Sequence, residues 1–341
     1  MTKMKFSITV LLIALGKCGF SQDPQFSQFF SSPLNINPAL TAHINADWRL
    51  ISNIRDQWIG PASPYVTGTV SYETKLFQNK IPNVDNSEDN VFGIGGMILY
   101  DHAMARIQRS TYASLNLSYN MKIADAGGSH RIGIGFGTTY GTRYIDFSRL
   151  YFQEQWIGYN GFNTNLPNGE AALSQMKNYF SVSTGLLYNF YTQKTNVDMG
   201  VSIYHLNGPK QTFLEDANQI VPPRKVAHAN FETFLNEGLV LSTNAVYQIQ
   251  KEANYFSVGA ALGTYVGDQQ NIFLNAGLWY WSNNAIIPYI GLAYNNFQFG
   301  ASFDITTSTL NQAAQKPKTF ELSLILKGTK KPGNIIPCPW K

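Results

Sequence analysis

Apolar and polar residues alternate along most of the chain from Asp47 onward. Residues two positions apart lie on the same face of a β-strand, so this pattern predicts strands with one apolar face and one polar or glycine-rich face. The segments 112–121, 132–141 and 320–327 show it clearly. In 255–266 the two faces read Phe256, Val258, Ala260, Leu262 and Val266 against Ser257, Gly259 and Gly263.

Turns rich in Asn, Gly and Ser separate fourteen such segments. An apolar outer face, a small or polar inner face and an even strand count are typical of bacterial outer-membrane barrels. The predicted fold class is therefore all-β, a transmembrane antiparallel β-barrel of about 14 strands. We expect the strands near 47–56, 65–76, 91–101, 108–121, 130–146, 179–191, 196–205, 227–236, 238–249, 254–266, 271–281, 285–295, 297–305 and 318–327.

The lengths of the connections predict which end of the barrel faces outward. With both termini in the periplasm, odd-numbered connections lie outside, where bacterial barrels carry their longer loops. The connections 147–178, 206–226 and 306–317 are long and odd-numbered, and even-numbered ones such as 192–195 are tight. The even-numbered connection 77–90 is also long and departs from the pattern.

The composition agrees with a membrane barrel and excludes other classes. Charged residues are 13% and aromatic residues 14% of the chain, which excludes disorder. Mean hydropathy is −0.16, and no apolar run of about 20 residues exists to form a helical membrane span. A soluble propeller would repeat every 40–45 residues or so, and no such repeat is present. We expect an interfacial belt from aromatic residues at strand ends, namely Trp48, Trp58, Tyr72, Tyr100, Trp279, Tyr280 and Trp281.

The N-terminus reads as a secretory signal peptide. Lys3 and Lys5 precede an apolar run over 6–15, and small residues allow cleavage near Ser21. Lipid attachment at Cys18 is the alternative, disfavoured by the lysine before it. Removing the three lysines of the leader leaves 22 basic against 21 acidic residues, which argues against a nucleic-acid partner. The predicted organisation is a signal peptide at 1–21, a periplasmic lead-in at 22–46, the barrel at 47–327 and a periplasmic C-terminal tail at 328–341, with Cys338 as the only thiol of the mature chain.

The sequence offers no convincing catalytic, cofactor or metal site. The five histidines have no zinc-ligand spacing, so they read as isolated polar residues at strand ends and loops. The glycines of 93–96 and 133–137 are not followed by a helix, so they do not form a phosphate loop. We expect them to thin the inner face so that lumenal aromatics or a plug segment can pack closely. The acidic residues of 85–89 lack the order of a calcium loop and read as a solvated loop.

Two segments carry aromatic residues with no strand or helix period to bury them. The lead-in contains Phe26, Phe29 and Phe30 among three prolines. We expect it to be a periplasmic docking segment for secretion machinery, with plugging of its own barrel as the alternative. The outer connection 147–178 holds five aromatics within a dozen residues, including Tyr151, Trp156 and Phe162. It either binds an external partner, as hot-spot composition favours, or folds inward as a lid.

The lead-in also resembles a known family. Gln22-Asp23-Pro24-Gln25-Phe26-Ser27-Gln28-Phe29, followed by Asn37-Pro38-Ala39, is similar to the opening of the PorP/SprF family, with Ala42 where we expect glycine. The segment 55–58, Arg-Asp-Gln-Trp, resembles the Arg-x-Gln-Trp element of that family. The closing 338–340, Cys-Pro-Trp, also looks familial, so the resemblance extends over essentially the whole chain.

This resemblance implies a non-enzymatic outer-membrane protein of the type IX secretion and gliding machinery of Bacteroidota-type bacteria. Such proteins help to secrete a cargo or adhesin, or retain it at the cell surface, together with periplasmic machinery components. The alternative is an outer-membrane transport channel for hydrophobic or small polar solutes. The expected partners are a secreted protein, machinery components and outer-membrane lipid, without a cofactor. The candidate partner-binding residues are Phe26, Phe29, Asn37, Pro38, Arg55, Trp58, Tyr151, Trp156 and Phe162.

Overall fold

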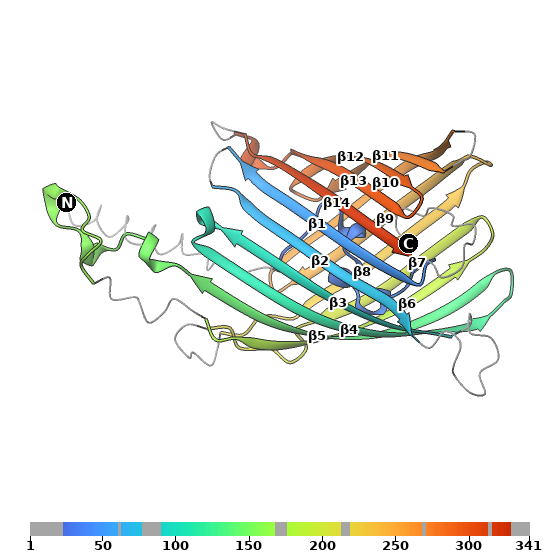
Figure 1. Cartoon of the computed structure of the whole chain (residues 1–341), viewed down its shortest axis with the longest axis horizontal. Helices are drawn as coiled ribbons and strands as arrows, with labels where there is room; N and C mark the ends of the chain where they lie inside the picture. The colour runs from blue at the N-terminus through green and yellow to red at the C-terminus, as the bar shows by residue number, and fades with distance from the viewer. Residues whose placement is uncertain are drawn as a thin grey trace, which may run out of the picture.

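The computed structural model describes residues 23–60, 63–76, 90–167, 176–212, 219–267, 271–312 and 316–328. Within them, fourteen antiparallel strands follow one another around a closed barrel, and β1 pairs with β14 to complete it (Figure 1). The strands are β1 (Trp48–Ile59), β2 (Tyr65–Leu76), β3 (Asn90–Ala103), β4 (Gln108–Ala124), β5 (Ser129–Ile145), β6 (Tyr179–Tyr191), β7 (Thr195–Tyr204), β8 (Arg224–Phe234), β9 (Leu239–Gln250), β10 (Ala253–Val266), β11 (Ile272–Trp281), β12 (Ala285–Tyr294), β13 (Phe297–Thr306) and β14 (Lys318–Gly328).

The predicted barrel is confirmed, and every strand begins and ends within three residues of the position predicted from the alternation. The small and polar residues face the lumen, as expected. In β10, Leu262 is half exposed on the outer wall, whereas Ser257 is buried toward the lumen. The apolar outer wall is the surface that lipid would cover. The predicted long connection at 77–90 lies outside the described residues except for its last position.

We call the end where β1 begins and β14 finishes the inner end, and the opposite end the outer end. The two long connections between β5 and β6 and between β7 and β8 both lie at the outer end, and their position outside the cell stays a prediction. The green connection after β5 projects beyond the strand ends in Figure 1. It contains the short helices η4 (Phe147–Arg149), η5 (Gln153–Gln155) and η6 (Gly158–Asn160).

The lead-in lies inside the barrel. Its short helices η1 (Phe29–Ser31), α2 (Pro33–Ile36) and η2 (Pro38–Leu40) are seen in blue within the strands in Figure 1. Two further short helices, η3 (Met104–Arg106) and η8 (Thr309–Gln312), lie in outer connections. None of the described helices is long and apolar enough to cross a membrane.

Candidate functional site

The described part of the lead-in, residues 23–46, plugs the lumen. Nearly all of its side chains are buried, with Phe26 and Phe29 each 3% exposed and Asn37 fully buried. The expectation of a periplasmic docking segment is therefore corrected, and the alternative of a plug within the same barrel is the one that the structure shows. The physical reason is that an apolar, period-free segment finds in the lumen both an aromatic surface and partners for its backbone.

The aromatic surface lies on strands β11 and β12. The ring of Phe30 lies 4.9 Å from that of Trp279 and 5.5 Å from that of Tyr289, centroid to centroid, and Trp279 and Tyr289 pack edge to face. Trp279 and Trp281 are thus buried in the lumen, so their predicted place in an interfacial belt is wrong. Burying large aromatic rings is a major source of packing free energy.

Two wall carboxylates hold the first half of the plug. Glu321, which is fully buried, accepts hydrogen bonds from the backbone N–H of Ser27 at 2.7 Å and of Gln28 at 3.1 Å. Asp304 accepts a hydrogen bond from the Ser27 hydroxyl at 2.8 Å. Arg55 pairs with Asp304 at 2.9 Å and donates to the carbonyl oxygen of Gln25 at 2.8 Å. Hydrogen bonds to a charged group are the stronger kind, so this cluster anchors the plug.

The second half of the plug is held in the same way near the inner end. Glu73 accepts a hydrogen bond from the backbone N–H of Ala42 at 2.7 Å and pairs with Arg49. Ala42 has φ of 55°, the left-handed region, which explains why glycine is the residue expected there. Asn37 donates to the carbonyl oxygen of Leu186 at 2.9 Å, and its side-chain oxygen caps η2 at the N–H of Ala39.

Glycines on the inner face make room for the plug. A Cβ added to Gly135 would collide with the backbone of Pro38 and Ala39, and one added to Gly185 would collide with the side chain of Asn37. The expectation that strand glycines thin the inner face for a plug is therefore confirmed. No larger residue fits at Gly135 while the plug keeps this path.

The first described residue of the plug, Asp23, lies at the outer end. Its carboxylate lies 2.9 Å from Nε2 of His205 and 3.0 Å from Nε of Arg224, and its backbone N–H donates to Gln250. Burial alone would raise the pKa of Asp23, but the charges of His205 and Arg224 outweigh it and hold the pKa well below its usual range. His205 and His228, which reaches Asn37, thus serve the plug and are not isolated polar residues.

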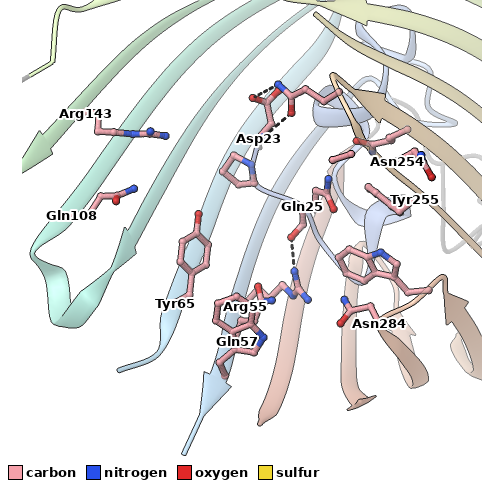
Figure 2. Close-up of a pocket in the computed structure, with 16 residues that line it drawn as sticks. Asp23, Gln25, Arg55, Gln57, Tyr65, Gln108, Arg143, Asn254, Tyr255 and Asn284 are labelled. Atoms are coloured by element: carbon pink, nitrogen blue, oxygen red, sulfur yellow. Dashed lines mark hydrogen bonds between the residues drawn. The ribbon is translucent and has the colours of Figure 1, made fainter. Parts of the chain in front are cut away.

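Above the plug lies a cavity of about 720 Å³ at the outer end, which we call the outer vestibule. Asp23, Pro24 and Gln25 form its floor, and strand ends form its walls (Figure 2). Gln108, Arg143 and Tyr65 line one side, and Asn254, Tyr255 and Asn284 line the other. The cavity is in the size range of ligand sites, about 300–1,000 Å³.

The connection after β5 presents an aromatic surface, the outer aromatic loop, defined as residues 151–162. Tyr159 is fully exposed, Tyr151 is 65% exposed and Trp156 is 54% exposed. Phe162 packs against Trp156 at 4.8 Å and against Tyr151 at 5.1 Å, centroid to centroid. The predicted alternative in which these residues fold inward as a lid is therefore not what the structure shows.

The nine candidate residues fall into three groups. Phe26, Phe29, Asn37 and Pro38 are buried in the plug, and Arg55 holds it. Trp58 lines the outer vestibule, although we expected it in the interfacial belt. Tyr151, Trp156 and Phe162 lie together on the outer aromatic loop. Binding of a partner by any of them stays a prediction.

Sequence reasoning singled out Arg55 but missed other charged residues of the lumen, including Arg49, Glu73 and Glu321. Arg49 is paired across the ladder with Glu73, and Arg55 with Glu321. The sequence does contain a signal for these residues, because oppositely charged residues occupy lumen-facing positions on neighbouring strands. Among the described residues, no group of three or more His, Cys, Asp or Glu side chains is placed to hold a metal ion.

Solved outer-membrane barrels are similar in fold. A Pseudomonas aeruginosa FadL homologue is 11% identical, with 85% of this chain and 92% of that chain covered and a TM-score of 0.44. The P. putida toluene transporter TodX is 10% identical, with 86% and 93% covered and a TM-score of 0.48. No curated protein matches the chain. The model of the type IX secretion system membrane protein PorP/SprF matches residues 19–326, so the chain belongs to the PorP/SprF family.

Proposed function

We propose that this barrel is a non-enzymatic component of the type IX secretion and gliding machinery that retains a secreted partner protein at the cell surface. The family and the barrel fold indicate the outer membrane. The proposal assigns two roles: the outer aromatic loop binds the partner protein, and the barrel anchors that protein to the membrane. Because the lead-in is buried in the lumen, we assign the contacts with periplasmic machinery to the turns at the inner end of the barrel.

The observation that carries the proposal is the exposure of ordered aromatics on the outer aromatic loop. The loop is braced from within by Gln155, which is 4% exposed. Its side chain donates to the carbonyl oxygen of Leu166 at 3.0 Å and accepts from the N–H of Phe152 at 3.3 Å. A braced surface loses little conformational entropy on binding, and exposed Tyr and Trp are the residue types that dominate protein interfaces.

A transport channel is the competing function, and the plug argues against it. The lumen is occupied from Asp23 at the outer end to Ala42 near the inner end, with wall hydrogen bonds along the way. Solute passage would require the plug to leave. Conductance in planar bilayers separates the two functions: a large steady current from the intact protein would favour the channel.

The test of retention is the surface display of the partner in cells that carry Tyr159→Ala or a deletion of 156–162. Truncating a hot-spot aromatic costs about 2 kcal/mol, or roughly 30-fold in affinity. We expect display to fall while the barrel stays inserted and heat-modifiable. Glu154→Ala, an exposed change on the same loop, is the matched control and should leave display unchanged. Normal display in the deletion strain would overturn retention through this loop.

A further inference from the structure

The outer vestibule has the features of a binding site that the plug does not use. Gln248 is 3% exposed, and its Oε1 has no hydrogen-bond partner among the described residues. A buried acceptor left unpaired is costly, so this end of the lumen carries a polar group that the plug does not satisfy. Most of the polar lining is carboxamide, including Gln108 and Asn254, and each carboxamide offers two donors and one acceptor.

An aromatic side chain is held in the vestibule by a strained backbone. Trp58 has φ of 66°, which a residue other than glycine adopts at a cost of about 1–3 kcal/mol. The register of β1 against β14 shifts between Asp56 and Ile59, and this irregularity turns Trp58 out of the strand alternation. On the other side, Tyr255 packs on Trp281 at 5.1 Å, centroid to centroid. Backbone strain of this kind persists where the surrounding structure fixes a side chain in one position.

The wall of the vestibule already binds polypeptide. Two of its residues, Arg55 and Gln250, hydrogen-bond to the plug backbone at Gln25 and Asp23. Deeper in the lumen, Asn53 donates to the carbonyl oxygen of Ser31 and Arg224 to that of Asn35. The vestibule continues this lining toward the outer end, above the first residues of the plug.

Charge also favours an uncharged backbone over an ionic ligand. Asp23 is paired with Arg224, and Arg55 with Asp304, so these charges near the floor are compensated. Arg143, the other charged residue of the lining, donates to the hydroxyl groups of Ser110 and Tyr112 in the wall. Carboxamides then supply most of the remaining polar contacts, and they match the alternating N–H and C=O groups of an extended chain.

We propose that the outer vestibule binds an extended segment of the extracellular partner polypeptide. Exposed carboxamides such as Asn254 pair with its backbone, and Trp58 and Tyr255 contact its side chains. The inference rests on the proposed function and assigns the partner a second point of contact, distinct from the outer aromatic loop.

The first experiment is photo-crosslinking in living cells. p-Benzoylphenylalanine replaces Gln108 in the vestibule, and Tyr144, which is exposed on the outer wall, is the matched control position. We expect a protease-sensitive adduct at position 108 and none at 144, with the attached peptide mapping by mass spectrometry to one segment of a secreted protein. A periodate-sensitive glycan adduct, an adduct to this same chain, equal adducts at both positions, or no adduct at 108 would each overturn the proposal.

The second experiment uses a synthetic peptide of the mapped segment with the purified, plugged barrel. Tryptophan fluorescence follows the titration, and Trp58→Phe and Asn254→Leu should each weaken binding at least about tenfold. Unchanged affinity in both variants would overturn the site. The display assay with Tyr159→Ala is independent of these two experiments. If display is lost in that variant but no adduct forms at position 108, only the vestibule inference is overturned. If the adduct forms but Tyr159→Ala displays the partner normally, only the proposal for the outer aromatic loop is overturned.

Discussion

The anchoring of the plug by Glu321 can be tested with one isosteric change, Glu321→Gln. In the plugged barrel the carboxylate accepts two backbone hydrogen bonds, from Ser27 and Gln28, and both are lost when the plug leaves. A buried backbone N–H that loses its acceptor costs about 1–3 kcal/mol. The amide keeps one acceptor oxygen and turns its NH2 group toward the other N–H.

The net loss of plug stability is therefore about 1–3 kcal/mol, which raises the population of the unplugged state roughly 5- to 150-fold. The substitution does not strand Arg55, since Asp304 still pairs with it at 2.9 Å. That is why the change should loosen the plug without unfolding the barrel.

The assay is thiol labelling of Ser31→Cys, with Cys18 and Cys338 replaced by Ser. Ser31 is 2% exposed, so a maleimide reaches it only when the plug opens. We expect the labelling rate to rise with the open population. Asp101→Asn is the matched control, because this buried carboxylate bonds to Thr67 and Tyr65 of the wall. Equal labelling rates with and without Glu321→Gln would refute the anchoring role.

Three further predictions concern the plug path, the lipid face and the topology. Gly135→Ala should increase thiol labelling of the plug, and Gly96→Ala, whose Cβ meets only one atom at 3.7 Å, should not. Leu262→Arg on the outer wall should cost about 2–4 kcal/mol in refolding titrations, whereas Leu262→Met should cost little; equal losses would mean that this face is not in lipid. A cysteine at Asn163 should react with an impermeant maleimide on intact cells, and one at Gln193 should not; the reverse would invert the topology.

The barrel could be predicted because its signal is local. Alternation fixes which residues share a face, and turns of a few residues fix the register. The alternation also shows why the predicted aromatic belt is partly wrong. Trp279, Tyr280 and Trp281 are consecutive, so they cannot share one face: Tyr280 is 42% exposed on the outer wall, and its two neighbours are buried in the lumen.

The plug could not be placed from the sequence because its partners are remote. Ser27 and Glu321 are 294 positions apart, and nothing in the lead-in specifies which wall residues receive it. The location of Trp58 was mispredicted for a different reason. The register shift in β1 breaks the alternation at that point, and such an irregularity leaves no clear trace in the pattern of apolar residues.

The plug and the vestibule share wall residues, so their stabilities should be linked. Arg55 and Gln250 hold the plug residues that form the floor of the vestibule. If the peptide binds only to molecules with that floor in place, its apparent affinity is the affinity of the plugged form multiplied by the plugged fraction. For a well-anchored plug, Glu321→Gln alone leaves most molecules plugged and should hardly change the affinity for the vestibule peptide.

Adding Gly135→Ala strains the plug at Pro38 and Ala39, at a site that shares no hydrogen-bond partner with Glu321. Overpacking of this kind costs about 1–3 kcal/mol, so the two losses should add to about 2–6 kcal/mol. If that sum exceeds the stability of the plug, peptide affinity falls in the double variant alone, and by reciprocity saturating peptide slows its Ser31→Cys labelling. A double variant that labels rapidly, yet binds the peptide as tightly as the intact barrel and labels no more slowly with peptide present, would show that the floor is not part of the site.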